Sequence, residues 1–272
     1  MLVQLTDLHI REPGRLAYGR IDTAPYLRTA VRSVMGLRQR PDAVVITGDL
    51  TDFGRAAEYA HLAELLAPLD MAVYLLPGNH DDRNQMRRSF PAHHWLGREG
   101  DFIQYSVQVG NLRLIALDTC EPGKSHGTLD AARLQWLERE LESYKQQPVV
   151  IAMHHPPFRT LIGHMDDIGL QEGAAELESI VARHPNIERV ICGHLHRAID
   201  VRFGGTIACT TPAPAHQVVL DLDPRAESRW TMEPPAFRVL AQDGHGRVIS
   251  HVAASGEFDG PYPFHDGGQL ID

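Results

Sequence analysis

Histidine, aspartate and asparagine gather in five short stretches of the sequence, each directly after a run of apolar residues. The stretches are TDLH, TGDL, PGNHDD, MHHPP and GHLH, and they supply Asp7, His9, Asp49, Asn79, His80, His154, His155, His194 and His196. Each stretch has an ordinary explanation by itself, because Gly-Asp and Pro-Gly-Asn are common turn sequences and a single histidine pair is a weak motif. Five of them in succession are poorly explained by chance and indicate one shared site.

The chemistry of these side chains favours a pair of metal ions. Imidazole and carboxylate groups are ligands of Zn, Fe and Mn, and the absence of a thiolate from the set argues against a soft-metal or iron–sulfur site. Asp49 is central in the series and is the expected bridge between two ions. Asn79 is a neutral ligand, so it leaves positive charge on the ions that can bind a phosphate and acidify a water.

The apolar runs predict the strands of an α/β core that positions these residues. Strands are expected at 2–5, 42–47, 71–76, 148–153 and 188–192, a hairpin at 102–118, and helices at about 22–40, 56–69, 82–90, 129–144 and 171–184. Ligands of open α/β sheets gather beyond the carboxyl ends of the strands, so the five stretches are expected to form one rim. In GHLH, alternation along a strand would place His194 and His196 on one face.

The composition is that of an ordinary globular protein. The chain has 272 residues, of which 43% are apolar and 22% charged, and its net charge of −9 argues against stable binding to nucleic acid or an anionic membrane. Its apolar runs are too short to span a bilayer, and its first residues lack a leader pattern. The three cysteines, Cys120, Cys192 and Cys209, are expected to be reduced thiols of a cytoplasmic protein.

Taken together, the five stretches resemble the signature of the calcineurin-like metallophosphoesterase superfamily, D-x-H, G-D, G-N-H-[D/E], H and G-H-x-H. YGRID (18–22), RPDAVV (40–45), MHHPP (153–157) and CGHLH (192–196) are similar to its class III cyclic-nucleotide phosphodiesterase branch, which includes bacterial glycerophosphodiesterases. The resemblance implies a four-layer α/β/β/α sandwich with a small strand-rich C-terminal cap. Residues 1–200 would form the catalytic core, and residues 201–272 would complete it and add a cap through which the chain forms dimers or larger homo-oligomers.

The resemblance also implies a role for each site residue. One metal would be held by Asp7, His9, Asp49 and His196, and the other by Asp49, Asn79, His154 and His194. His155 would be a neighbour of the site rather than a ligand. His80 would face the phosphate and the leaving oxygen, with Asp81 hydrogen-bonded to its far nitrogen. Tyr18 and His216 are candidate substrate contacts, although His216 is equally compatible with an ordinary strand position.

The implied reaction is hydrolysis of a small phosphodiester by a hydroxide held between two divalent ions of Mn, Fe or Zn. The substrates would be 3′,5′-cyclic nucleotides, glycerophosphodiesters or both. Related protein phosphatases carry an arginine where GDLTDFG has Phe53, and its loss disfavours a dianionic monoester more than a monoanionic diester. Arg55 lies nearby in the sequence and leaves the monoester alternative open.

Three other functions remain open at this level. A nuclease would need a basic groove, which the acidic balance does not favour. A lipid-head-group pyrophosphatase would need an exposed apolar helix, for which the lid-like segment 158–170 is the nearest candidate. A non-catalytic metal-binding scaffold would be expected to have lost His80 or a ligand, and the sequence retains all of them.

Overall fold

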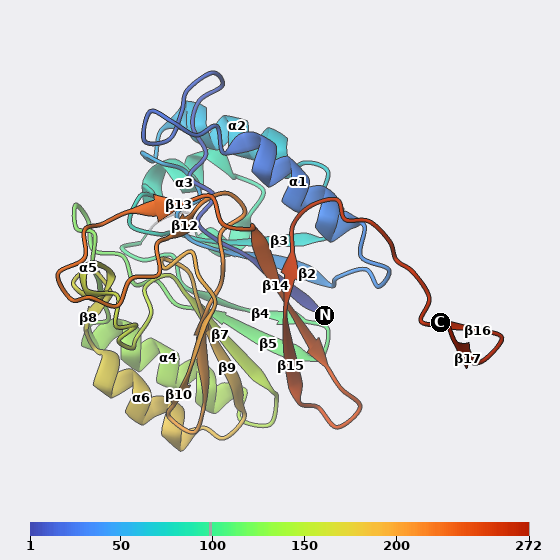
Figure 1. Ribbon diagram of the computed structural model, residues 1–272. Coiled ribbons are helices and arrows are strands. Elements are labelled where there is room, and N and C mark those ends of the chain that lie inside the picture. Colours follow the sequence, from blue (N-terminus) through green and yellow to red (C-terminus); the bar gives the residue numbers. More distant parts are fainter. Residues whose placement is uncertain (98–99, 272) are drawn as a thin grey trace.

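The computed structural model describes residues 1–97 and 100–271, and its centre is formed by two sheets (Figure 1). The five-stranded sheet has the order β15-β14-β1-β2-β3 and consists of β1 (Leu2–Leu5), β2 (Ala43–Thr47), β3 (Ala72–Leu76), β14 (Ala236–Gln242) and β15 (Val248–Ala254). The six-stranded sheet has the order β10-β11-β9-β7-β5-β4 and consists of β4 (Tyr105–Val109), β5 (Leu112–Ala116), β7 (Val149–Met153), β9 (Ile187–Cys192), β10 (Ile199–Phe203) and β11 (Thr206–Thr210). Buried side chains of both sheets share one apolar cluster, so the sheets pack face to face.

Helices cover the outer face of each sheet. The first set is α1 (Ala24–Met35), α2 (Ala56–Leu66) and α3 (Arg83–Ser89), and the second is α4 (Ala131–Ser143) and α6 (Ala174–Arg183) (Figure 1). Leu134, Leu137 and Leu141 form the buried stripe of α4, as their spacing predicts. The predicted four-layer α/β/β/α sandwich is confirmed.

The strand directions explain why polar residues meet at one rim. β1, β2 and β3 run parallel in one sheet, and β5, β7 and β9 run parallel in the other. β2 and β7 are buried along their whole length, as expected for continuous apolar runs covered on both faces. Three of the five polar stretches therefore follow strands of one sheet, and two follow strands of the other.

Several boundaries differ from those predicted. The first helix ends at Met35 rather than near residue 40, and Gly36, a poor helix former, follows it. The helix expected from residue 171 begins at Ala174, because β8 (Leu170–Glu172) pairs with β6 (Gly127–Thr128). The remaining short elements are α5 (Gly163–Asp166), the 3₁₀ turn His94–Leu96, β12 (Gln217–Val218) and β13 (Trp230–Thr231).

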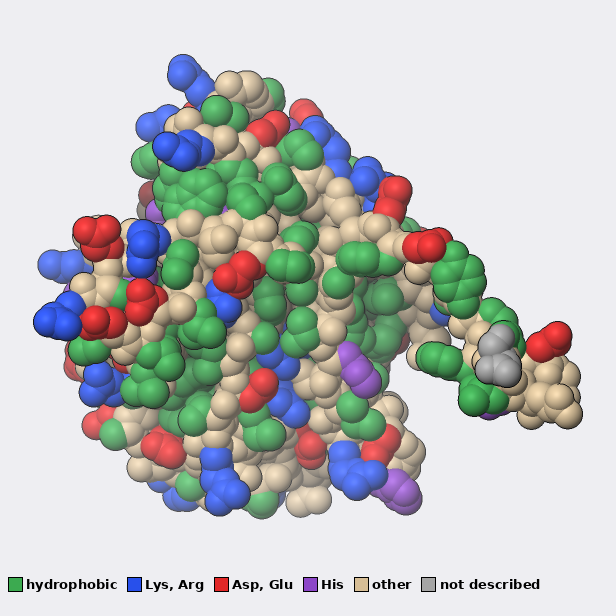
Figure 2. All heavy atoms as spheres, viewed as in Figure 1, with side chains coloured by type: hydrophobic (Ala, Val, Ile, Leu, Met, Phe, Trp, Pro, Cys, Tyr) green, Lys and Arg blue, Asp and Glu red, His purple; other side chains and the backbone are tan. Residues whose placement is uncertain are grey.

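The predicted C-terminal segment contributes to both sheets and then leaves the body of the protein. β10 and β11 join the six-stranded sheet, and β14 and β15 join the five-stranded sheet. The tail after Ala254 projects outward with a small pair of strands, β16 (His265–Asp266) and β17 (Gln269–Leu270), and carries exposed apolar side chains (Figures 1 and 2). Asp272, the last residue of that segment, lies outside the described residues. None of the described helices is both long and apolar enough to cross a bilayer.

Candidate metal centre

The seven predicted metal ligands come together at the rim formed by the strand ends. Asp7, Asp49 and His154 place donor atoms within 4.8 Å of one another, and so do His9, Asp49 and His80. The other ligand-type groups within this distance are His154, His155 and His194, and His9, His196 and His216. These sets overlap at Asp49, His9 and His154, which is the arrangement that two neighbouring ions need.

Asp49 occupies the centre of the cluster. Its Oδ2 atom lies 3.6 Å from Nε2 of His9, and its Oδ1 atom lies 3.5 Å from Nε2 of His154. The two oxygens of one carboxylate thus face histidines that the family resemblance assigns to different metals. Burial raises the pKa of Asp49, but the neighbouring His154 and His80 outweigh it and hold that pKa well below its usual value.

The remaining predicted ligands lie at similar distances from one another. Nε2 of His196 lies 3.5 Å from Oδ1 of Asp7. On the other side, Nε2 of His154 lies 3.1 Å from Oδ1 of Asn79 and 3.3 Å from Nδ1 of His194. These contacts join His196 to Asp7 of one predicted ligand set, and His154 to Asn79 and His194 of the other.

Three of the histidines are oriented by hydrogen bonds at Nδ1, the ring nitrogen that faces away from the cluster. His154 donates from Nδ1 to the Thr47 carbonyl at 2.8 Å, and His196 donates from Nδ1 to the His216 carbonyl at 3.0 Å. Nδ1 of His9 lies 3.2 Å from the Asp52 carboxylate. In each case this bond engages Nδ1 and directs Nε2 into the cluster, where it can bind a metal once it carries no proton.

The cluster contains buried nitrogens that lack partners. Nε2 of His9, Nε2 of His194 and Nδ1 of His216 form no hydrogen bond with the described part of the chain. A buried polar atom left unpaired costs about 1–3 kcal/mol. Burial, followed by neighbouring histidines, holds the pKa of His9 and of His194 well below the usual value, so both are in the neutral form that binds metal. The residues fit a pair of divalent ions.

The backbone at the centre is held in an unusual conformation. Asp7, His9, Asp49, His194 and His196 have φ between 44° and 70°, the left-handed region that non-glycine residues rarely adopt. Such conformations cost about 1–3 kcal/mol each and persist where function requires them. The prediction that His194 and His196 share a strand face is wrong, because β9 ends at Cys192 and both histidines lie on the loop that follows.

Two glycines of the motifs allow the loops to approach one another. A Cβ atom on Gly78 would lie 2.2 Å from the backbone nitrogen and from Oδ1 of Asp49. One on Gly193 would lie 2.2 Å from Oγ1 of Thr6. The glycines before Asn79 and before His194 are thus required by close contact with the neighbouring ligand loops.

The predicted hydrogen-bond partner of the His80 ring, Asp81, is wrong. His80 donates from Nδ1 to the backbone carbonyl of Asp52 at 2.9 Å, not to Asp81. The Asp81 carboxylate instead accepts hydrogen bonds from the Gly78 and Leu50 backbones at 2.9 and 3.0 Å and from the Tyr59 hydroxyl at 2.8 Å. It joins the loop that carries Asn79 to the loop that carries Asp49, and it is a positioning residue.

His155 is bonded outside the cluster. Its Nε2 donates to the Ser125 carbonyl at 3.2 Å, and its Nδ1 accepts from the Thr119 hydroxyl at 2.8 Å. Both ring nitrogens are therefore engaged, which supports the expectation that His155 is a neighbour rather than a ligand.

A comparison with known proteins agrees with this geometry. Residues 1–198 match the family described as calcineurin-like phosphoesterase. The chain belongs to this family. This confirms the membership that the five motifs predicted.

Relatives match this phosphoesterase over most or all of its length. It is 35% identical to a probable glycerophosphodiester phosphodiesterase GpdQ from Arcobacter nitrofigilis, with all of both chains covered. It is 31% identical to a 3′,5′-cyclic adenosine monophosphate phosphodiesterase CpdA from Pseudomonas aeruginosa, over 93% of this chain and 89% of the relative. A crystal structure of a dimetal phosphatase from Danio rerio has the same fold, with a TM-score of 0.61 and 19% identity over 94% of this chain and 98% of the other.

The phosphoesterase has a pocket of about 230 Å³ over the cluster. Tyr18 and His216, the predicted substrate contacts, both line it, and Nε2 of His216 lies 3.3 Å from the Tyr18 hydroxyl. His164 and Trp230 line it as well, and the sequence analysis missed both. No motif marks either residue, and only the position of His164 within the lid-like segment 158–170 could have drawn attention to it.

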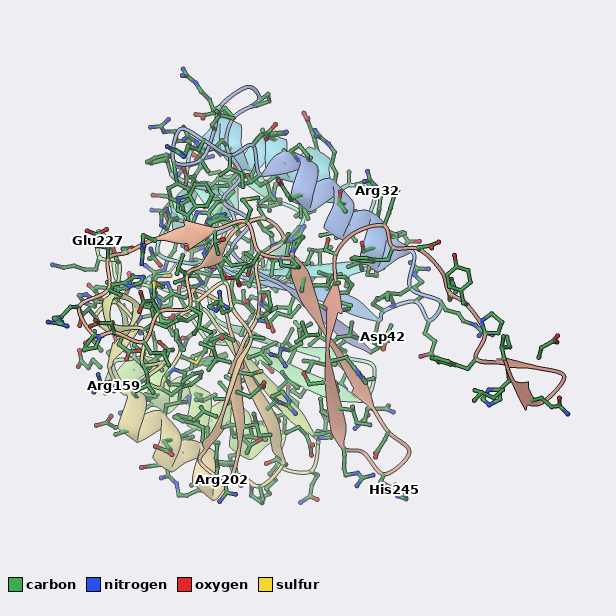
Figure 3. The ribbon with its side chains drawn as sticks, in the orientation of Figure 1. Arg32, Asp42, Arg159, Arg202, Glu227 and His245 are labelled. Atoms are coloured by element: carbon green, nitrogen blue, oxygen red, sulfur yellow. The ribbon has the colours of Figure 1, made fainter. Side chains whose placement is uncertain are left out.

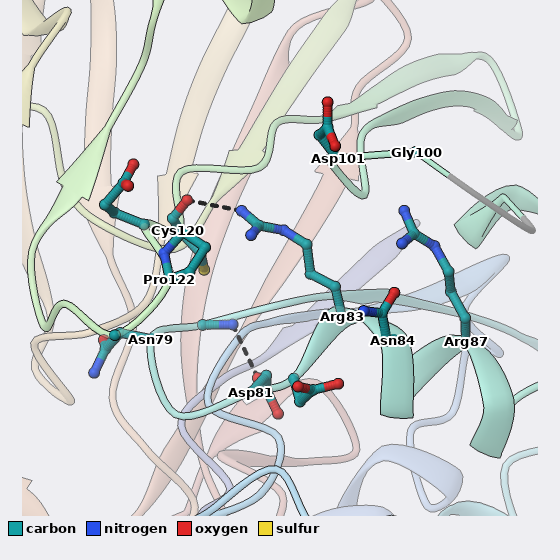
Figure 4. Close-up of a pocket in the computed structure, with 13 residues that line it drawn as sticks. Asn79, Asp81, Arg83, Asn84, Arg87, Gly100, Asp101, Cys120 and Pro122 are labelled. Atoms are coloured by element: carbon teal, nitrogen blue, oxygen red, sulfur yellow. Dashed lines mark hydrogen bonds between the residues drawn. The ribbon is translucent and has the colours of Figure 1, made fainter.

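A larger cavity of about 460 Å³ lies behind the loop of Asn79 (Figure 4). Its arginines are already bound to the protein, since Arg83 donates to both oxygens of Asp118 at 2.6 and 2.8 Å and Arg87 donates to backbone carbonyls. The Asn79 side chain points away from this cavity (Figure 4). The cavity over the metal cluster is therefore the better candidate for substrate.

Proposed function

We propose that this phosphoesterase hydrolyses small phosphodiesters with two divalent metal ions. The observation that carries the proposal is the position of Asp49, whose two oxygens face His9 and His154 of the two predicted ligand sets. The names of its full-length relatives, a glycerophosphodiester phosphodiesterase and a cyclic AMP phosphodiesterase, support the choice of diesters as substrates.

The proposed ligands divide between two ions of Mn, Fe or Zn. Asp7, His9, Asp49 and His196 would hold one ion, and Asp49, Asn79, His154 and His194 the other. When bound, the ions supply positive charge that offsets the charge of the phosphate and lowers the pKa of a water. Because only two carboxylates belong to the set, the loaded site keeps a net positive charge that suits an anionic substrate.

His80 is proposed to contact the phosphate and to supply a proton to the leaving oxygen. Its Nδ1 is held by the Asp52 carbonyl, and its backbone nitrogen donates to Oδ1 of Asp49 at 3.0 Å, so the ring is fixed beside the metal cluster. Burial lowers the pKa of His80, but Asp49 and the bond to Asp52 outweigh it and raise that pKa. Tyr18 and His216 are proposed to contact the substrate from the pocket wall.

The surroundings of Phe53 favour a diester over a monoester. Phe53 is 56% exposed and lies between the guanidinium groups of Arg11 and Arg55, 4.5 and 4.8 Å from its ring centre. Arg55 also pairs with Glu12 at 3.4 Å, and it is not among the residues that line the pocket. Arg55 therefore does not replace the arginine that grips a dianion in the protein phosphatases.

The two substrate classes are compared directly with chromogenic esters. Protein loaded with Mn²⁺ is expected to hydrolyse bis(p-nitrophenyl) phosphate with a larger kcat/KM than p-nitrophenyl phosphate. A preference for the monoester would reject the diesterase assignment and leave a phosphomonoesterase. If the protein turned over neither ester with Mn²⁺, Fe²⁺ or Zn²⁺, a metal-binding scaffold would be favoured.

The C-terminal tail is proposed to hold copies of the chain together as a homo-oligomer, with residues 1–200 as the catalytic core. Phe264 is 81% exposed, and Phe258, Tyr262 and Leu270 are exposed with it. β15 forms an edge of its sheet and exposes Ile249 and Val252. An apolar tail beside an exposed sheet edge is the type of surface that a second chain covers.

A cytoplasmic location is proposed on the state of the cysteines. Cys120, Cys192 and Cys209 are all free and buried. Free thiols are typical of proteins kept in a reducing compartment.

A further inference from the structure

Part of the substrate pocket is built by two segments that lie outside the main sheets. α5 and the residues after it supply His164, Met165 and Ile168, and the pair β12–β13 supplies Val218 and Trp230. These residues face the same cavity as the metal ligands. They will therefore contact whatever group a diester carries on its phosphate.

His164 stands in this wall with no bonding partner of its own. Both of its ring nitrogens are buried, and neither forms a hydrogen bond with any residue in the described ranges. A neutral imidazole has one donor and one acceptor, and leaving both unpaired costs about 1–3 kcal/mol for each atom. The two nitrogens point in diverging directions, so the edge of one ligand would pair with one of them.

α5 is anchored firmly enough to hold His164 in place. The Asp166 carboxylate accepts hydrogen bonds from the backbone and the hydroxyl of Thr160 at 2.7 and 2.8 Å. Ile162 and Met165 are buried in one apolar cluster with Leu195, which lies between His194 and His196 of GHLH. The wall is thus packed directly on the loop that carries two of the metal ligands.

The two wall segments also pack against each other. A Cβ atom on Gly163 would lie 2.9 Å from the carbonyl oxygen of Pro224, which belongs to the connection between β12 and β13. Figure 3 shows Arg159 and Glu227 on the same side of the molecule. Arg159 lies just before α5, and Glu227 lies in the connection between β12 and β13. The pocket wall is therefore a continuous structure.

Trp230 and Tyr18 add aromatic rings to this wall. Their ring centres are 5.8 Å apart with an interplanar angle of 32°, and His216 lies 5.7 Å from Trp230. Burial, together with the nearby Asp52, raises the pKa of Tyr18, so its ring is neutral. Stacking on an aromatic side chain stabilises a bound nucleobase by about 1–3 kcal/mol, whereas glycerol and ethanolamine have no π-face to stack.

We propose that His164, Tyr18 and Trp230 form a nucleobase subsite, which makes nucleotide diesters the preferred substrates of this enzyme. The base stacks on the aromatic rings, and His164 hydrogen-bonds to its edge. This inference rests on the proposed phosphodiesterase function and narrows its substrate class. Its test must therefore separate the subsite from the hydrolytic activity.

The first test compares kcat/KM for cyclic AMP and for glycerophosphoethanolamine in Mn²⁺-loaded protein. Trp230→Leu is expected to lower the value for cyclic AMP about tenfold more than that for glycerophosphoethanolamine, and Trp230→Phe to restore most of the loss. His164→Ala is expected to act selectively in the same direction. Leu222→Ala on the β12–β13 connection and His245→Ala at the distant β14–β15 turn are the matched controls. Equal losses for both substrates would mean a structural role and overturn the proposal.

The second test measures binding without turnover. By calorimetry, adenosine 5′-monophosphate is expected to bind the loaded protein about ten- to a hundredfold more tightly than glycerol 3-phosphate, and Trp230→Leu to abolish most of that difference. If no diester is hydrolysed but this selectivity is found, the subsite stands and the phosphodiesterase function falls. If diesters are hydrolysed but both ligands bind equally, the function stands and the subsite falls.

Discussion

Oδ1 of Asp52 lies 3.2 Å from Nδ1 of His9, and the backbone carbonyl of the same Asp52 accepts a hydrogen bond from Nδ1 of His80 at 2.9 Å. One residue therefore orients a proposed metal ligand and the proposed proton donor. Arg11 fixes the other carboxylate oxygen of Asp52 at 3.3 Å. Hydrogen bonds on the side of each ring that faces away from the cluster therefore fix the orientation of both histidines.

Asp52→Asn is expected to weaken Mn²⁺ binding and kcat about 10- to 100-fold, the usual effect of removing the carboxylate behind a metal-binding histidine. The backbone bond to His80 survives the change, so the loss should come mainly through His9. Metal titration and steady-state kinetics check this. Asp259→Asn, in the exposed tail, is the control. Unchanged metal affinity in Asp52→Asn would contradict the role of Asp52 in positioning His9.

Asp49→Asn is expected to lose both metal ions, whereas His196→Ala should lose mainly one. The reason is that the two oxygens of Asp49 face both ligand sets, whereas Nε2 of His196 faces only the set with Asp7. Elemental analysis after dialysis against trace metal measures this directly, with two ions per chain expected in the unaltered protein. If Asp49→Asn kept a full pair of ions, Asp49 would not be the bridge.

The sequence predicted those residues of this centre that belong to the five motifs. Asp49, His154 and the GHLH histidines each follow an apolar strand, and they meet because the parallel strands of the two facing sheets end at the same rim. Asp52 was missed, although GDLTD places a second carboxylate three residues after Asp49 and on the same loop. Asp81 was misassigned because adjacency to His80 does not determine where a side chain points at a turn.

The pocket wall could not be predicted in the same way. Trp230 and His164 reach the pocket from a short strand and a single helical turn, and such elements leave no periodic pattern in a sequence. Their positions depend on long-range packing, such as that of Ile162 and Met165 on Leu195. Substrate selectivity is for this reason the least predictable property of the chain.

Tyr59→Phe is expected to lower the free energy of unfolding by about 1.5–3 kcal/mol, because the buried Tyr59 hydroxyl donates to the Asp81 carboxylate at 2.8 Å. Metal affinity should fall as well, since Asp81 joins the two ligand loops. The matched control is Tyr105→Phe, whose buried hydroxyl donates at 2.9 Å to the neutral Leu75 carbonyl within β3 and contacts neither Asp81 nor a predicted ligand. Denaturant unfolding and metal titration measure both effects. An equal loss of metal affinity in the two variants would contradict this role of Asp81.

Mn²⁺ uptake by the metal-free protein is expected to strengthen as the pH rises from about 6 to 9. Burial lowers the pKa of His154, but Asp49 and then Asp7 outweigh it and raise that pKa to about 9. Below this pH the ring carries a proton that a metal must displace, so the apparent affinity should rise about tenfold per pH unit and level off above 9. Calorimetry in buffers of different ionisation enthalpy counts the proton released. Binding without proton release at pH 7 would contradict the assignment.

Removal of residues 257–272 is expected to convert a homo-oligomer to a monomer without unfolding the core. The last strand of the five-stranded sheet ends at Ala254, and Ser255 still bonds to the Pro235 carbonyl at 2.8 Å, so the deletion removes no strand of either main sheet. Light scattering after size-exclusion chromatography gives the mass of each form, and circular dichroism verifies that the core stays folded. Phe264→Ser with Leu270→Ser tests the same surface at full length, because both side chains are exposed on the tail. An assembly of unchanged mass in all three proteins would show that another surface joins the copies, and β15 with Ile249 and Val252 would be the next to alter.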